Sequence, residues 1–163
     1  MMTLEGSCRC GAVRFSVESH APHPYQLCYC SICRKTAGGG GYAINLSAEA
    51  DTLKVEGADA VRVYRAELVD ESGEPTTSSG ERNFCTRCAT ALWLFDATWP
   101  TLIHPFASAI DTALPVPPAR THIMLRFKAT WVVPDIGPED VSHDLYPDES
   151  IEHWHRARGL WLD

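Results

Sequence analysis

The sequence has no long apolar run and no recognisable export signal. Its longest apolar stretches, such as ALWLF and TWVV, fall far short of the roughly 20 residues that a transmembrane helix needs. The first residues, MMTLEGSCRCG, contain neither the basic leader nor the apolar stretch of a secretion signal. We therefore expect no membrane partner and a cytoplasmic location, where thiols stay reduced.

Basic residues are also scarce. The 163 residues include 14 Lys and Arg against 21 Asp and Glu, which gives a formal net charge of −7. Non-specific binding to nucleic acid depends on Lys and Arg that neutralise phosphates, so no nucleic-acid partner is expected. No repeat or linker appears, and the length predicts one domain over residues 1–163.

Long helical patterns are absent because eleven glycines and eleven prolines interrupt the chain. What remains is a series of short segments rich in Val, Ile, Thr and aromatic residues. In AVRFSV, for example, Val13, Phe15 and Val17 alternate with polar residues. The pattern predicts a mainly β fold of short antiparallel strands, with strands expected in residues 12–17, 42–46, 51–55, 61–66, 90–95, 101–106, 121–127 and 128–133.

One helix is predicted, near the C-terminus. In DESIEHWHRARGLWL, Ile151, Trp154, His155 and Arg158 share one face of a helix. Acidic residues lie in its first turn and basic residues in its last, which suits the helix dipole. We expect its tryptophans to pack onto the body of the protein.

The seven cysteines all lie in close-set groups: SCRCG with Cys8 and Cys10, then Cys28, Cys30 and Cys33, then NFCTRCAT with Cys85 and Cys88. Clustered cysteines in a reducing compartment are typical of metal ligands, because thiolate is a soft donor that binds zinc or an iron–sulfur cluster strongly. An odd number argues against a simple disulfide framework. No helical pattern follows either C-x-x-C pair, which argues against a redox motif.

Spacing alone allows two partitions of the cysteines. Cys30 and Cys33 could join Cys85 and Cys88, which leaves three cysteines unused. Alternatively, Cys8 and Cys10 join the last pair in a closed four-sulfur site, and the triplet stays intact. The second partition uses every cysteine, and three protein ligands would leave a fourth tetrahedral position for water or substrate. No histidine stands at a strict ligand spacing from a cysteine, so none of His20, His23, His104 and His122 is assigned to a metal.

Three ordered motifs, GSCRCGAVRFSV, CYCSICRK and NFCTRCATALW, resemble the glutathione-dependent formaldehyde-activating enzyme family, which includes centromere protein V. A downstream stretch, SAIDTALPVPPARTHIMLRFKATW, resembles the Pro…His-Ile…Lys…Trp pattern of the same family. The similarity covers roughly residues 4–133 and leaves a C-terminal extension over residues 134–163.

The resemblance implies a β-rich fold with two zinc ions per chain. It implies a structural zinc on Cys8, Cys10, Cys85 and Cys88, and a catalytic zinc on Cys28, Cys30 and Cys33. It further implies a carbon–sulfur lyase that forms S-hydroxymethylglutathione from glutathione and formaldehyde, or the reverse. A zinc-stabilised binding module without catalysis and an iron–sulfur protein are the alternatives. A homodimer is left open.

Several basic residues lie near the cysteine motifs: Arg9, Arg14, Arg34, Lys35, Arg82 and Arg87. They could offset the charge of the thiolates, and Arg34 or Lys35 could hold the carboxylates of glutathione. Arg34 is the preferred substrate contact. Two positions differ from the family pattern: Ala89 stands where glycine is usual, and Tyr29 where histidine is common. We expect Tyr29 to lie beside the open zinc position and to influence the choice of substrate.

Overall fold

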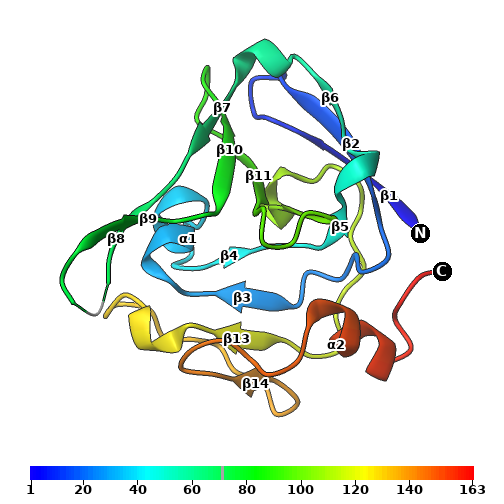
Figure 1. Cartoon of the computed structure of the whole chain (residues 1–163). Coiled ribbons are helices and arrows are strands. Elements are labelled where there is room, and N and C mark those ends of the chain that lie inside the picture. The colour runs from blue at the N-terminus through cyan, green and yellow to red at the C-terminus, as the bar shows by residue number, and fades with distance from the viewer. Residues whose placement is uncertain (71) are drawn as a thin grey trace.

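The computed structural model describes residues 1–70 and 72–163, and it confirms the mainly β class. Four sheets and two short helices make up the regular structure (Figure 1). No helix of the described residues has the length and apolar character that crossing a bilayer requires.

A three-stranded sheet faces a five-stranded sheet across the main core. The first has the order β1-β2-β6, and the second has the order β5-β12-β11-β10-β7. Their bounds are β1 Met2–Ser7, β2 Arg14–Ser19, β5 Ala48–Glu49, β6 Lys54–Glu56, β7 Val61–Tyr64, β10 Glu81–Cys85, β11 Ala91–Phe95 and β12 Leu102–Pro105. All ladders in these two sheets are antiparallel, as expected.

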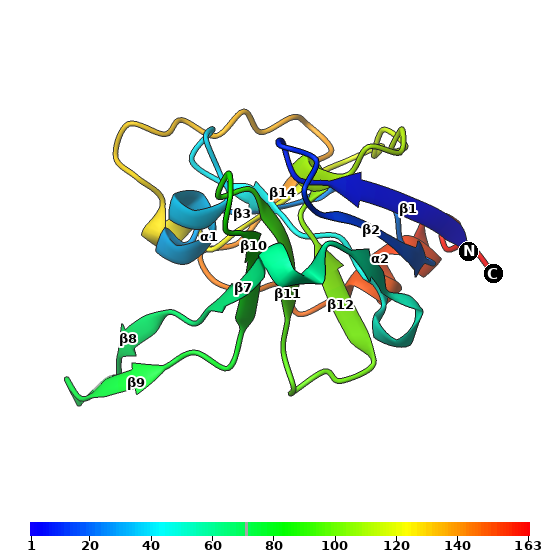
Figure 2. The same cartoon turned by 90° about the horizontal axis from the view of Figure 1, so that it is seen from above.

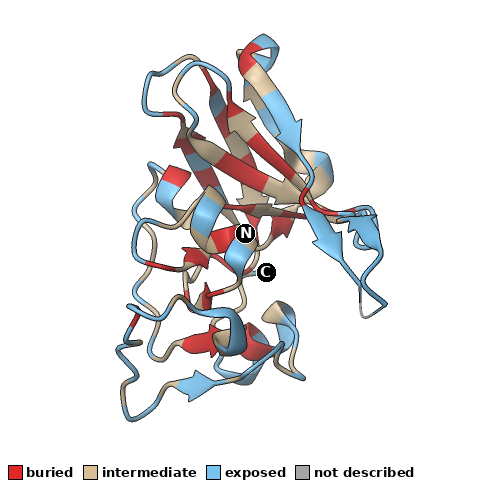
Figure 3. Ribbon diagram, turned by 90° about the vertical axis from the view of Figure 1, so that its left-hand side faces the viewer, coloured by how far each residue is buried: buried red, intermediate tan, exposed pale blue. Residues whose placement is uncertain are grey.

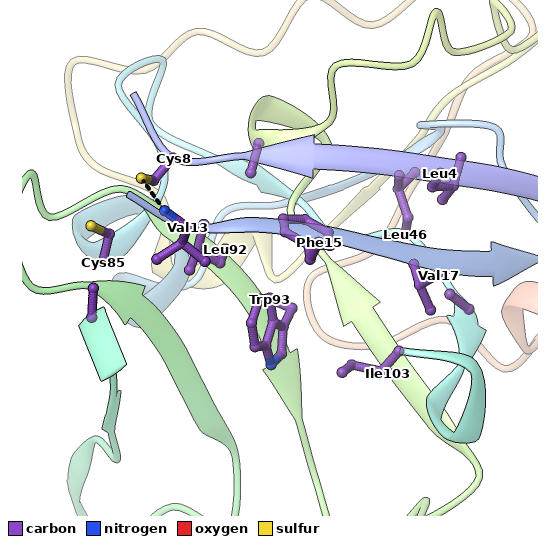
Figure 4. Packing of buried hydrophobic residues seen from close by; sticks show 13 residues of the cluster. Leu4, Cys8, Val13, Phe15, Val17, Leu46, Cys85, Leu92, Trp93 and Ile103 are labelled. Atoms are coloured by element: carbon purple, nitrogen blue, oxygen red, sulfur yellow. Dashed lines mark hydrogen bonds between the residues drawn. The ribbon is translucent and has the colours of Figure 1, made fainter. Parts of the chain in front are cut away.

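The alternation along β2 produces this core. Phe15 and Val17 are buried between the sheets, and the Phe15 ring meets the edge of Trp93 at 5.1 Å between ring centroids (Figure 4). Leu92 and Ile103 approach from the opposite sheet. Apolar side chains that point inward from both sheets therefore fix the register of the strands, because a one-residue slip would expose them.

A four-stranded sheet with the order β14-β13-β3-β4 lies below the five-stranded sheet in Figure 1. Its strands are β3 Gln26–Cys28, β4 Ala43–Ile44, β13 Thr121–Ile123 and β14 Val141–Ser142. β13 pairs in parallel with both β3 and β14, so the expectation of antiparallel strands is wrong here. A smaller cluster, with Phe106 and Ile123 among its members, packs against this sheet.

Three of the expected strands differ clearly from the structure. In the segment 51–55 the chain begins with a 3₁₀ turn, Ala50–Thr52, and the strand starts only at Lys54. In the segment 121–127 the strand stops at Ile123, because Met124 takes a left-handed backbone with φ of 62° and a 3₁₀ turn follows. Residues 128–133 form no strand, although Val132 is buried. A hairpin of β8 Glu67–Val69 and β9 Pro75–Thr77, which was not predicted, projects from the body (Figure 2).

Both helices are short. The predicted C-terminal helix is confirmed as α2, Ile151–Ala157, and the Ser150 side chain accepts a hydrogen bond from the His153 N–H at its start. Trp154 is buried and stacks on Tyr25 at 3.7 Å between ring centroids. The other helix, α1 Ser31–Thr36, follows Cys30 directly, where no helix was expected.

Figure 3 shows buried residues concentrated between the layers, whereas the β8–β9 hairpin is exposed.

Candidate metal centres

The seven cysteines are free and form two clusters, one of Cys8, Cys10, Cys85 and Cys88 and one of Cys28, Cys30 and Cys33. Within each cluster the sulfur atoms lie within 4.8 Å of one another, so each cluster could hold a metal ion. This grouping is the second of the two partitions that the spacing allows. We call the clusters the four-cysteine site and the three-cysteine site.

The four-cysteine site joins two turns that lie far apart in the sequence. Cys8 and Cys10 come from the turn between β1 and β2, whereas Cys85 ends β10 and Cys88 lies in the turn before β11. The Cys8 and Cys10 sulfurs are 3.5 Å apart, and those of Cys10 and Cys85 are 3.9 Å apart. Four sulfurs around zinc at about 2.3 Å would be about 3.8 Å apart, so the donor set fits that ion.

Hydrogen bonds from backbone N–H groups and from a hydroxyl group favour the thiolate form of these cysteines, which is the form that binds a cation. The Val13 N–H donates to Cys8 Sγ at 3.2 Å (Figure 4). The Thr90 hydroxyl lies 3.2 Å from Cys88 Sγ, and hydrogen bonds from the Thr90 side chain and backbone lower the pKa of Cys88 to about 5. At least one thiol of the cluster is therefore ionised at neutral pH, which is the form that binds metal.

The three-cysteine site depends on the end of a strand and the start of a helix. Cys28 ends β3, Cys30 caps α1, and Cys33 lies in its first turn. The Cys33 N–H donates to Cys30 Sγ at 3.3 Å. Hydrogen bonds from the Cys28 and Cys33 side chains, with this N–H, lower the pKa of Cys30 to about 2. Cys28 and Cys33 are buried and Cys30 is half-buried, so the site sits just below the surface.

Neither Tyr29 nor any histidine of the described residues belongs to the three-cysteine cluster. Tyr29 directly follows β3 and is buried in a separate apolar cluster with Leu27 and Val132. Its hydroxyl lies 2.8 Å from His122 Nδ1. The expectation that Tyr29 lies beside the open position is wrong, because successive side chains of an extended segment point to opposite faces.

An open cleft of about 640 Å³ is lined by residues that neighbour both cysteine sites in the sequence. Three basic residues line it, Arg9, Arg34 and Lys35, and none of its lining residues in the described part of the chain is a carboxylate. Ala37 and Ala91 also line the cleft and pack against the cluster that contains Cys28 and Cys33. The positive cleft thus borders the three-cysteine site. The presence of Arg9 and Arg34 on one cleft has no signal in the sequence, because it depends on the tertiary contact between the β1–β2 turn and the segment of α1.

Ala89 carries backbone strain beside the four-cysteine site. Its φ is 60°, in the left-handed region, and its N–H donates to the Cys85 carbonyl at 2.8 Å. An alanine there costs about 1 kcal/mol relative to glycine. We expect Ala89→Gly to raise the free energy of unfolding of the metal-loaded protein by about 1 kcal/mol in denaturant titrations. Ala97→Gly, in an exposed turn with no positive φ, should lower that free energy. An equal loss of unfolding free energy in Ala89→Gly and Ala97→Gly would contradict the inference that Ala89 is strained.

The comparisons with known proteins agree with this geometry. The family model described as "Glutathione-dependent formaldehyde-activating enzyme" matches residues 3–125. A protein of Halomonas elongata is 59% identical over 159 residues, covering 98% of each chain, and its name reads "Putative glutathione-dependent formaldehyde-activating enzyme". A Rhodobacter sphaeroides protein of known crystal structure has the same fold, with a TM-score of 0.50 and 24% identity over 70% of this chain and 92% of its own. The chain belongs to the glutathione-dependent formaldehyde-activating enzyme family.

Proposed function

We propose that this protein is a zinc-dependent carbon–sulfur lyase that joins glutathione, or a related anionic thiol, to formaldehyde and catalyses the reverse reaction. The observation that supports this most directly is a cluster of three cysteine sulfurs with no fourth ligand among the described residues, at the border of a positively charged cleft. Membership of the family supports the pair of substrates. The two sulfur clusters support two zinc ions per chain.

The two clusters have different roles in this proposal. The four-cysteine site is saturated by protein ligands and holds the fold together. A zinc ion on Cys28, Cys30 and Cys33 would supply a position at which a thiol loses its proton at neutral pH. The sulfur then forms a bond to the carbonyl carbon of formaldehyde, the π electrons of the carbonyl move to its oxygen, and that oxygen takes a proton from solvent.

The cleft gives the thiol its orientation. Glutathione carries two carboxylates, and a chain with a net charge of −7 needs a local positive field to attract it. Arg34 directly follows Cys33, and its buried Nε atom has no hydrogen-bond partner among the described residues. Arg34 is therefore the proposed carboxylate contact, with Arg9 and Lys35 on the same cleft.

Exchange NMR tests the function, because formaldehyde and thiol also react without a catalyst. Zinc-loaded protein should accelerate exchange between free glutathione and its hydroxymethyl adduct above the rate of a sample without protein. With 2-mercaptoethanol, which has no carboxylate, the acceleration should be much smaller. A folded protein with two zinc ions that leaves glutathione exchange at the spontaneous rate would sink the lyase assignment and favour a binding module. Iron in place of zinc would indicate an iron–sulfur protein.

A further inference from the structure

Arg82 is a buried cation with no counter-charge among the described residues. The residue is 8% exposed, which makes it the one buried Lys or Arg in the described part of the chain. Within that part its side chain makes a single weak hydrogen bond, from Nη1 to the Gly80 carbonyl at 3.4 Å, and its Nε has no partner there. No carboxylate of residues 1–70 and 72–163 lies within ion-pair distance of it. Buried charges are normally paired, so this guanidinium needs an anion.

The sheet directs Arg82 toward the three-cysteine site. Arg82 on β10 is the register partner of Leu94 on β11, so the two side chains share a face of the five-stranded sheet. Leu94 packs against the cluster that contains Cys28 and Cys33. The same face therefore presents Arg82 to the cysteine sulfurs.

Asn45 contributes a second polar group beside the three-cysteine site. Its Nδ2 lies 3.9 Å from Cys33 Sγ, and its Oδ1 is buried without a partner in the described residues. A buried cation and a buried acceptor that both lack partners are complementary to a small group that carries a negative oxygen or sulfur and a hydroxyl. A thiolate, and then a hydroxymethyl group attached to sulfur, has this chemistry.

We propose that Arg82 compensates the negative charge that enters the three-cysteine site with the substrate. This rests on the proposed function. A zinc ion held by Cys28, Cys30 and Cys33 as thiolates would carry one net negative charge, and a substrate thiolate would add a second. Formation of the carbon–sulfur bond would move negative charge to the former carbonyl oxygen, which would accept hydrogen bonds from the guanidinium until it took a proton from solvent. Arg82 therefore favours anionic ligands over neutral ones.

Cobalt-substituted protein allows this preference to be measured without turnover. Azide, glutathione and imidazole are titrated into the full-length protein, and binding is followed by the cobalt absorption spectrum. Arg82→Gln should weaken binding of azide and glutathione about tenfold while leaving imidazole binding unchanged, because only the anions interact with the lost charge. Arg82→Lys should restore most of the ratio of anion affinity to imidazole affinity. The matched control is Arg62→Gln, an exposed arginine on the neighbouring strand β7.

A ratio in Arg82→Gln equal to that of wild type, with two metal ions retained, would overturn the proposal. If Arg82 has only a structural role, Arg82→Gln should weaken the binding of azide and of imidazole by the same factor. That result would also overturn the proposal. If Arg82→Gln does not retain its metal, Arg82→Met decides, because it also removes the charge but keeps a long side chain in the buried position. A ratio of anion affinity to imidazole affinity in Arg82→Met equal to that of wild type would then count against Arg82. The readout needs no formaldehyde, so it is independent of whether the lyase activity is found.

Discussion

Cys85→Ser should yield a protein that loses most of its stability together with one of its two metal ions. The Cys85 side chain is fully buried, and its sulfur lies in the main core as well as in the four-cysteine site. A structural zinc contributes roughly 10–16 kcal/mol of apparent binding energy in small peptides, whereas a whole domain is stable by only about 5–15 kcal/mol. Serine is a poor ligand for zinc, so the variant loses an interaction as large as its total stability.

Thermal and urea unfolding followed by circular dichroism, with metal content measured on the same samples, checks this result. Chelation of the metal from wild-type protein should give the same loss. Cys33→Ser is the matched control, because Cys33 is also buried but belongs to the other cluster. An unfolding midpoint for Cys85→Ser at the wild-type value would show that the sheets hold together without the four-cysteine site.

Cys33→Ser should abolish catalysis and leave the fold intact. In the proposed mechanism the three sulfurs have no fourth ligand among residues 1–70 and 72–163 to compensate for the loss of one, so the metal at that site should be lost. Exchange of glutathione with its adduct should fall to the spontaneous rate, and the zinc content should fall from about two to about one per chain. Unfolding should begin near the wild-type temperature, because the four-cysteine site is unchanged.

Ser31→Ala provides the comparison within the same helix, since Ser31 is exposed at the start of α1. Its exchange rate and zinc content should match those of wild type. Should Cys33→Ser retain the wild-type exchange rate with one zinc, the chemistry would have to be assigned to the four-cysteine site or to the cleft alone.

The sequence predicts those parts of the structure that leave a local pattern. Alternation along residues 12–17 marks β2, and the short cysteine spacings mark the three groups that build both clusters, although spacing alone allows two partitions. The helix α1 leaves no such pattern, because its six residues make fewer than two turns and one of them, Cys33, is explained by the metal motif. Cys30, which caps this helix with its sulfur, replaces the usual Ser, Thr, Asp or Asn.

Contacts between distant segments are the part that the sequence does not predict. The parallel pairing of β13 with β3 joins residues about 95 positions apart, and nothing in either segment selects the other. The same holds for the cleft, where Arg9 of the β1–β2 turn and Arg34 of α1 line one surface only through tertiary contacts. Arg82 stands out only once its burial is known, because an arginine in a strand is ordinarily expected at the surface.

The distance between the two turns of the four-cysteine site also sets an order of events during protein synthesis. The ribosome completes the three-cysteine set at residue 33, whereas the four-cysteine set is complete only at residue 88, which is 55 residues later. At about 5–20 residues per second, several seconds separate the two. In that interval the triplet is the only other cysteine group that has been synthesised, so Cys8 and Cys10 either stay metal-free or share a metal ion with it. The native partition therefore requires that Cys8 and Cys10 be available to the late pair, which the reversible binding of zinc to thiolates allows.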